Sequence, residues 1–309
     1  MKKVFIDGSA GTTGLRIYER LADRKDIQLL TLPEEKRKDA SARKEMINSA
    51  DIVFLCLPDD ASREAVAMTE NENVVIIDAS TAHRTESGWA YGFPELSKTH
   101  EENVKTGKRI AVPGCHASGF IALVYPLIEA GILDKDVLLT CHSVTGYSGG
   151  GKKMIAEYEG EERNALLGAP RQYALTQQHK HLKEMKAVCG LENAPIFCPI
   201  VSDFYSGMHV TVPLFKSQLK KGGIEEIKAV YKAKYQTKFV EYVDSVDEGG
   251  FISGLAHANT DGMQVAVYGN EERMILTAVY DNLGKGASGA GIECMNLALG
   301  VDEKQGLVL

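Results

Sequence analysis

The first half of this sequence alternates short, almost wholly apolar segments with helical patterning, and this alternation constrains the fold more than any other feature. The apolar segments are Val4–Ile6, Ile27–Leu32, Ala50–Leu57, Val74–Asp78 and Arg109–Val112. Helices are predicted between them at Gly14–Asp23 and Asp59–Met68. Strands that are apolar on both sides are typical of a parallel sheet covered by helices on both faces. This part of the chain therefore predicts a doubly wound, Rossmann-like α/β domain.

The second half has a different pattern, because several of its strand-like segments alternate apolar and polar residues. These segments are Asp136–Thr145, His209–Phe215, Lys238–Val246, Met263–Tyr268 and Arg273–Tyr280. They predict a mixed or antiparallel sheet in an α+β domain, with a helix at Gly222–Tyr235. A last helix is expected at Ala287–Leu299. We expect one domain at residues 1–114, completed by residues 285–309, and a second at residues 115–284.

Composition excludes several classes of protein. The 309 residues are 44% hydrophobic and carry a net charge of −7, which argues against nucleic acid as the main partner. No apolar run approaches the roughly 18 residues of a membrane helix, and the first run is too short for a signal peptide. No C-x-x-C pair occurs among the six cysteines, so no zinc or dithiol site is indicated. Free thiols fit a reducing compartment, which predicts a cytoplasmic protein.

A glycine-rich loop follows the first predicted strand and opens a helix. It reads Gly8, Ser9, Ala10, Gly11, Thr12, Thr13 and Gly14, a G-x-x-G-x-x-G spacing. Glycines let the backbone approach a pyrophosphate, and the helix N-terminus points N–H groups at it. The loop therefore favours dinucleotide binding, with a plain tight turn as the alternative.

The choice of dinucleotide stays open at this level. Glu34 and Glu35 lie where a ribose-reading carboxylate is expected, which favours NAD. The basic run 36–38 follows directly and favours the extra phosphate of NADP. A solvated charged loop is the third interpretation.

Cys115 is the candidate nucleophile. It follows a Pro113-Gly114 bend and sits at the start of an apolar helical pattern. A helix N-terminus favours a thiolate and lowers a thiol pKa from about 8.5. Its N–H groups also stabilise an oxyanion on an attacked carbonyl. A packed structural cysteine is the alternative.

A proton-transfer partner is expected in the segment from Tyr173 to His181. His179 and His181 are two residues apart and cannot share a helix face, so at most one should point at a given site from a helix. No metal site is predicted, because no third ligand lies nearby; a surface histidine pair is the plain alternative. His116 and His142 are further candidates.

Two polar loops complete the set. The segment 143–152 carries four glycines in six residues, which permits close approach to a ligand or makes a flexible hairpin. The segment 281–289 joins a strand to the last helix, as a ligand loop or a solvated turn.

The ordered motifs GSAGTTG, DASTAHR, YGFPE, VPGCHASG, SVTGYSGGGK, HKH and DNLGKGASG resemble the shorter N-acetyl-γ-glutamyl-phosphate reductases. The resemblance spans Gly8 to Asn296. It implies NADPH-dependent conversion of N-acetyl-γ-glutamyl phosphate to N-acetylglutamate semialdehyde in arginine biosynthesis, through a cysteine thioacyl intermediate. Cys115 falls on the family's nucleophile and His179 on its acid–base histidine, with His181 as the alternative. Asn282 falls on the residue that orients the nicotinamide, and the glycine loop would bind the pyrophosphate.

Charge and position add Arg84, Ser148 and Lys152 as substrate-binding candidates. The resemblance also implies a homo-oligomer, a dimer or tetramer, assembled through the second domain. An aspartate-semialdehyde dehydrogenase is the nearest enzyme alternative, because it shares this chemistry. A non-catalytic nucleotide-binding redox regulator and a reductase of carrier-bound substrates are alternatives of other kinds; the latter should carry a basic patch that the pI near 5.7 does not suggest.

Overall fold

The apolar strands of the first half lie side by side in one parallel sheet. The computed structural model describes residues 1–309 and divides into two units, Met1–Gly114 with Ala287–Val308, and Cys115–Gly286 with Leu309. The first unit contains a six-stranded sheet in the order β2-β1-β3-β4-β6-β5, with every pair parallel. Its strands are β1 (Lys2–Asp7), β2 (Ile27–Leu30), β3 (Ile52–Leu55), β4 (Val75–Asp78), β5 (Ala90–Tyr91) and β6 (Arg109–Ala111). The predicted doubly wound parallel sheet is confirmed.

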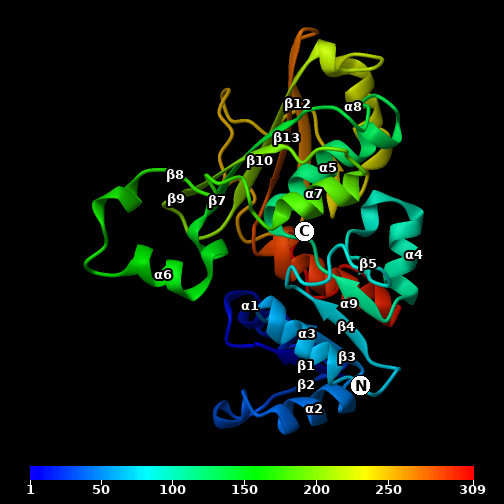
Figure 1. Ribbon diagram of the computed structural model, residues 1–309, viewed down its shortest axis with the longest axis vertical. Helices are drawn as coiled ribbons and strands as arrows, with labels where there is room; N and C mark the ends of the chain where they lie inside the picture. Colours follow the sequence, from blue (N-terminus) through cyan, green and yellow to red (C-terminus); the bar gives the residue numbers. More distant parts are fainter. The chain divides into compact units, whose positions relative to one another are not determined.

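Helices cover both faces of this sheet (Figure 1). They are α1 (Thr12–Leu21), α2 (Ala40–Ser49), α3 (Asp59–Ala67), α4 (Lys98–Thr106) and α9 (Gly289–Leu299). One core joins α1, α4 and α9 to strand residues such as Val4 and Ile6, whereas the other joins α2 and α3 to residues such as Phe5. Successive strand residues enter opposite cores, which explains why these strands are apolar throughout.

The second unit is built on a seven-stranded mixed sheet in the order β11-β12-β13-β10-β7-β9-β8. Its strands are β7 (Thr140–Gly146), β8 (Arg171–Gln172), β9 (Ile196–Ser202), β10 (Met208–Phe215), β11 (Val240–Tyr242), β12 (Met263–Gly269) and β13 (Arg273–Tyr280). The β7–β9 and β11–β12 pairs are parallel, and the other pairs are antiparallel. The predicted mixed sheet is thus confirmed.

Helices of the second unit pack on one face of that sheet. They are α5 (Cys115–Glu129), α7 (His181–Cys189) and α8 (Ile224–Lys234), while α6 (Gly151–Glu159) lies in the connection from β7 to β8. Strand β10 alternates accordingly: Val210, Val212 and Leu214 are buried, whereas Pro213 and Phe215 are exposed. The far face is therefore left partly open and apolar.

Two predicted strands of the second unit are shorter than expected. The segment predicted from Asp136 becomes a strand only at Thr140, because a turn closed by the Val137 N–H and the Asp134 carbonyl precedes it. The strand predicted at Lys238–Val246 is paired only over Val240–Tyr242. Beyond it the chain turns away, and the Val246 N–H donates to the Tyr268 hydroxyl at 2.6 Å instead of to a ladder partner.

Candidate active site and nucleotide loop

The glycine loop of the first unit runs from the end of β1 into α1. Gly8 has φ +89°, and a Cβ there would lie 2.3 Å from the Cys56 carbonyl oxygen. A Cβ on Gly14 would lie 2.4 Å from the Gly8 carbonyl oxygen. Both positions therefore require glycine, because any side chain would force the loop away from β3 or α1.

The N-terminus of α1 is arranged to receive an anion. Gly11 is the N-cap residue, and no side chain caps the helix. The first-turn N–H groups have no partner within an α-helix and carry its positive dipole end. Thr12 Oγ1 is buried there without a hydrogen-bond partner. These features fit the pyrophosphate of a dinucleotide. Residues 34–38 after β2 are all exposed, with 34–36 in a 3₁₀ turn.

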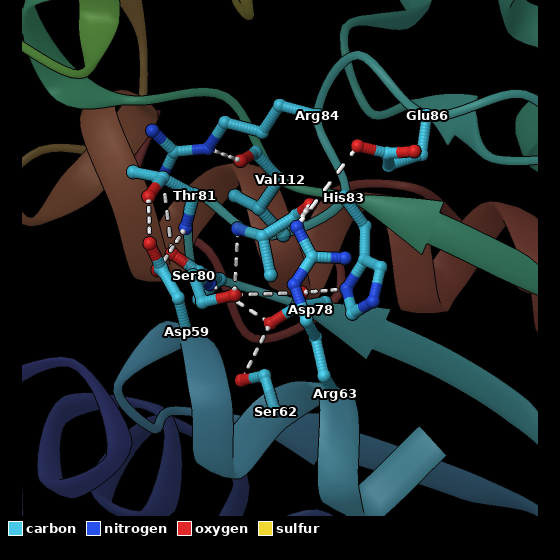
Figure 2. Close-up of polar contacts among 12 residues, drawn as sticks. Asp59, Ser62, Arg63, Asp78, Ser80, Thr81, His83, Arg84, Glu86 and Val112 are labelled. Carbon is cyan, nitrogen blue, oxygen red and sulfur yellow. Dashed lines mark hydrogen bonds and ion pairs between the residues drawn. The ribbon is translucent and has the colours of Figure 1, made fainter. Parts of the chain in front are cut away.

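A buried polar network follows β4 (Figure 2). Asp78, the last residue of β4, is fully buried and accepts hydrogen bonds from Ser62 Oγ at 3.2 Å and from the Ser80 N–H at 2.9 Å. Its other oxygen lies 2.8 Å from Ser80 Oγ and 2.6 Å from His83 Nδ1. The His83 ring stacks on Trp89 with centroids 4.1 Å apart. The network holds the turn that carries Arg84.

Arg84 binds the main chain at the ends of two neighbouring strands. Its Nε donates to the Val112 carbonyl at 2.8 Å, and its Nη2 donates to the Ala79 carbonyl at 3.0 Å (Figure 2). Ala79 follows β4 and Val112 follows β6. The sequence suggests a substrate contact for this guanidinium and gives no sign that it ties down the chain just ahead of Pro113.

Cys115 is the first residue of α5 and is half-buried. The first turn of α5 is bridged by the hydroxyl of Tyr280 on β13. This hydroxyl accepts the Gly119 N–H at 3.0 Å and donates to the Cys115 carbonyl at 2.5 Å. A Cβ on Gly119 would lie 2.6 Å from that oxygen, so glycine makes the bridge possible. Tyr280 therefore sets the main-chain geometry at the candidate nucleophile.

Cys115 opens onto a cavity of about 210 Å³ within the second unit. The lining residues are Cys115, His116, Thr145, Gly146, Gly149, Gly150, Met154, Tyr173, His179, His181 and Val201. The structure thus brings together the predicted cysteine, both histidines of the HKH motif and three glycines of the 143–152 loop. His142 is exposed, because it alternates along β7 with the buried Ser143.

Both His179 and His181 reach the cavity, which corrects the expectation of a single histidine there. That expectation assumed one helix, but only His181 lies in α7, and His179 belongs to the preceding turn. Their ring centroids are 4.7 Å apart. His181 is buried, whereas His179 is partly exposed. The His181 N–H donates to His179 Nδ1 at 3.2 Å, so a neutral His179 carries its proton on Nε2.

The segment that carries Tyr173 and His179 is fastened to β9. The Tyr173 N–H donates to the Pro199 carbonyl at 3.0 Å. The Gln177 carboxamide pairs with the main chain of Phe197, donating to its carbonyl at 2.7 Å and accepting its N–H at 2.8 Å. Ala174 and Gln177 adopt positive φ angles of 52° and 56°. Sequence reasoning missed Gln177, because nothing in its spacing distinguishes it from a polar loop residue.

Burial shifts the pKa values of two side chains that line the cavity. Burial, with a contribution from nearby His179, lowers the pKa of His116 from 6.5 to about 3. Burial, with a contribution from Cys115, raises the pKa of the Tyr173 hydroxyl well above its ordinary value. At neutral pH His116 is therefore uncharged and Tyr173 keeps its proton.

The cavity lining does not include Asn282, Ser148 or Lys152. Asn282 is buried after β13; its carboxamide accepts the Gly207 N–H at 2.9 Å and donates to Ser148 Oγ at 3.0 Å. The Ser148 side chain is only 1% exposed to solvent, and its hydroxyl is engaged by Asn282. Lys152 is exposed in the first turn of α6. No group of three or more His, Cys, Asp or Glu residues is placed to hold a metal ion.

Family models match both units. The semialdehyde dehydrogenase NAD binding domain matches residues 3–104, and the semialdehyde dehydrogenase dimerisation domain matches residues 115–282. The N-acetyl-gamma-glutamyl-phosphate reductase 2 of Nostoc sp. is 44% identical over 99% of both chains. The N-acetyl-gamma-glutamyl-phosphate reductase of Rhizobium meliloti is 45% identical over 96% of this chain and 98% of its own.

Solved structures share the fold. Aspartate semialdehyde dehydrogenase from Francisella tularensis gives a TM-score of 0.72 at 14% identity, covering 96% of this chain and 99% of its own. Aspartate semialdehyde dehydrogenase with NADP from Candida albicans gives a TM-score of 0.68 at 15% identity, covering 96% of this chain and 98% of its own. None of the helices here combines the length and apolarity of a membrane-spanning segment.

Proposed function

The chain belongs to the N-acetyl-γ-glutamyl-phosphate reductases of the semialdehyde dehydrogenase family, and from this membership we propose its reaction. It reduces N-acetyl-γ-glutamyl phosphate with NADPH to N-acetylglutamate 5-semialdehyde and phosphate, a step of arginine biosynthesis. The observation that carries this function is Cys115 at the first residue of α5, in one cavity with His179. Aspartate-semialdehyde dehydrogenases resemble the chain at 14–18% identity, against 41–45% for the reductases.

Covalent catalysis begins at Cys115. Its thiolate attacks the acyl carbon; a C–S bond forms, the C–O bond to phosphate breaks, and phosphate leaves. The N–H groups at the start of α5 stabilise the oxyanion that precedes this departure. The resulting thioester is easier to reduce than a carboxylate, which is why a thiol nucleophile suits the reaction.

The cofactor is NADP(H), and residues Gly8 to Gly14 would hold its pyrophosphate at the start of α1. When bound, its nicotinamide supplies the hydride that converts the thioester to the oxidation level of an aldehyde. Asn282 would orient the nicotinamide, and Ser148 would support Asn282, to which it is bonded.

His179 is the acid–base group in this proposal, in preference to His181. It is the more exposed of the two rings, and its Nδ1 already receives the His181 N–H. Nε2 is then the atom that exchanges protons with the substrate oxygen. It protonates the developing oxygen and takes that proton back as the C–S bond breaks, which releases the aldehyde and the thiolate.

Basic groups would bind the substrate's anionic groups. Lys152 is exposed next to Gly149 and Gly150, which line the cavity, so it is the leading candidate. Arg84 remains a candidate with a second role, since two of its nitrogens bind main-chain carbonyls.

The two units take different parts in this function. We assign NADP binding to residues 1–114 with 285–309, and catalysis and oligomerisation to residues 115–284. The open face of the second sheet would form the interface of a cytoplasmic dimer, or of a tetramer built from such dimers. Phe215 is 61% exposed there and Ile275 is 43% exposed, as expected of residues that a partner covers.

The phosphate-dependent reverse reaction tests the function. NADPH formation is followed at 25 °C with N-acetylglutamate semialdehyde and, in parallel, with aspartate semialdehyde. Cys115→Ser is compared with Cys198→Ser, a matched change at a partly exposed cysteine on β9. We expect turnover of the acetylated aldehyde that disappears only in Cys115→Ser. Preference for aspartate semialdehyde would overturn the substrate assignment, and activity in Cys115→Ser would overturn the mechanism.

A further inference from the structure

The imidazole of His116 is held from both ends inside the second unit. His116 Nδ1 lies 2.6 Å from Ser143 Oγ, and Nε2 lies 2.6 Å from the Tyr173 hydroxyl. His116 is 3% exposed, and Ser143 is fully buried. Phe197 packs against the imidazole, with ring centroids 5.3 Å apart. The three polar side chains thus form a line that starts at β7 and ends at the cavity.

A neutral imidazole has one N–H and one lone pair, so only two proton arrangements are available to this line. In the first, Ser143 donates to Nδ1, and Nε2–H donates to Tyr173. In the second, Nδ1–H donates to Ser143, and Tyr173 donates to Nε2.

The surroundings of Ser143 distinguish the two arrangements. Its hydroxyl has His116 Nδ1 as its only hydrogen-bond partner. The second arrangement would leave the Ser143 proton buried and unused, which costs roughly 1–3 kcal/mol. The first arrangement gives the Ser143 O–H and the imidazole N–H a partner each, and leaves over only the Tyr173 O–H, which can reach the cavity. Burial of the imidazole keeps it uncharged, so the choice persists at neutral pH.

The consequence falls on Tyr173. In the first arrangement its oxygen accepts from His116, and its own O–H is left to donate into the cavity that it shares with Cys115. In the second arrangement it would present only lone pairs there, which repel a thiolate. The proton position on His116 therefore decides whether the cavity wall offers a donor or an acceptor to an anion.

We infer that Ser143 and His116 are positioning residues that hold His116 as its Nε2–H tautomer and thereby aim the Tyr173 proton at the Cys115 sulfur or at the oxyanion formed on it. Neither residue needs to touch the substrate to act in this way. Only the identity of that oxyanion rests on the proposed function; the orientation of the proton does not.

Nuclear magnetic resonance of ¹⁵N-histidine-labelled protein tests the tautomer directly. Long-range ¹H–¹⁵N spectra distinguish an Nε2–H ring from an Nδ1–H ring, and loss of one signal set in His116→Gln assigns His116. We expect the Nε2–H pattern, unchanged between pH 6 and 8. An Nδ1–H pattern, or a charged ring at pH 7, overturns the inference. This measurement uses wild-type protein and needs no substrate.

The effect on the sulfur is measured by alkylation. The rate at which iodoacetamide modifies the Cys115 peptide is followed against pH by mass spectrometry in wild type, Tyr173→Phe and His116→Phe. The titratable groups that line the cavity with Cys115 are His116, Tyr173, His179 and His181. Tyr280 of β13 contacts the Cys115 carbonyl as well. Each variant changes one of these groups and leaves the others as in wild type. We expect each variant to raise the pH midpoint of the alkylation rate by about one unit, which corresponds to a tenfold change in thiolate population.

A double variant and a control make this test specific. Because Tyr173 and His116 act in one line, the double variant should move the midpoint no further than either single change. Tyr158→Phe removes another buried tyrosine hydroxyl, bonded to Arg171, and should leave the midpoint unchanged. His116→Gln retains an N–H donor for Tyr173, so its midpoint should lie close to the wild-type value. Unshifted midpoints in Tyr173→Phe, or additive shifts in the double variant, overturn the inference.

These outcomes are separable from those of the proposed function. The protein could be inactive towards the acetylated aldehyde and still show the Nε2–H ring and the shifted midpoints. That result would refute the proposed reaction and support the inferred role of Ser143 and His116. An active enzyme whose His116 carries its proton on Nδ1 would support the proposed reaction and refute the inferred role of Ser143 and His116.

Discussion

Tyr280→Phe is expected to slow catalysis without unfolding the protein, because the Tyr280 hydroxyl bridges the first turn of α5. The hydroxyl accepts the Gly119 N–H and donates to the Cys115 carbonyl, the two groups that an α-helix pairs at this spacing. Removing it takes one hydrogen bond from each of these two main-chain groups. The first turn of α5 is then no longer fastened to β13, and we expect Cys115 to shift.

The magnitude follows from the bonds that are lost. A buried neutral hydrogen bond contributes about 1 kcal/mol net, and an unsatisfied group costs roughly 1–3 kcal/mol. We expect a loss of about 2 kcal/mol in the free energy of unfolding by urea. We also expect kcat to fall at least about tenfold, since 1.4 kcal/mol of transition-state stabilisation corresponds to a factor of ten.

Tyr231→Phe is the matched control. The Tyr231 hydroxyl is buried and donates to the Leu123 carbonyl of the same helix, 2.5 Å away, two turns beyond Cys115. Its loss should cost similar stability and leave kcat within about twofold. Equal falls in kcat in both variants would show that α5 responds as a whole. An unchanged kcat in Tyr280→Phe would refute the idea that the bridge holds the nucleophile.

Three other predictions follow from features of the two units. Gln177→Ala breaks the pairing with Phe197 and should lower kcat about tenfold, whereas Gln178→Ala at the exposed next position should not. Gly14→Ala places a Cβ 2.4 Å from a carbonyl oxygen and should raise KM for NADPH more than tenfold; an unchanged KM would remove the loop from the cofactor site. His116 has a pKa lowered from 6.5 to about 3, so between these pH values the unfolded chain binds a proton that the folded chain does not. Stability from this group is complete above pH 6.5 and falls by about 1.4 kcal/mol per pH unit below it. Between pH 7 and pH 5, wild type should therefore lose about 2 kcal/mol more than His116→Gln in urea unfolding; equal losses would contradict it.

The fold was largely predictable because its strongest signals are local. A strand buried on both faces must be apolar at successive positions, so β3 and β4 are visible in the sequence alone. β9 was missed, because Pro199 interrupts its pattern although its neighbours still pair with β7. Helix α6 was missed as well, since three glycines precede its first polar turn and favour a loop.

The candidate site was predictable only in its chemistry. Cys115 and the HKH motif could be identified because thiols and imidazoles are few and their contexts distinctive. Their partners could not, because each comes from a distant part of the chain: Tyr280 reaches Cys115 across 165 residues, and Tyr173 reaches His116 across 57. A tyrosine hydroxyl that bridges a helix turn has no sequence signature, since the same residue packs in many cores without bonding.

The stack of His83 on Trp89 gives the first unit an optical label. Trp89 is the only tryptophan of the chain, and it lies within the unit that carries the glycine loop. Indole emission excited at its own wavelength therefore reports on that unit alone, and the imidazole 4.1 Å away makes it sensitive to the turn behind Asp78. Chemical modification of Cys115 reports on the other unit. A chain of two units need not unfold in a single step, and these two signals allow each half to be followed in one sample.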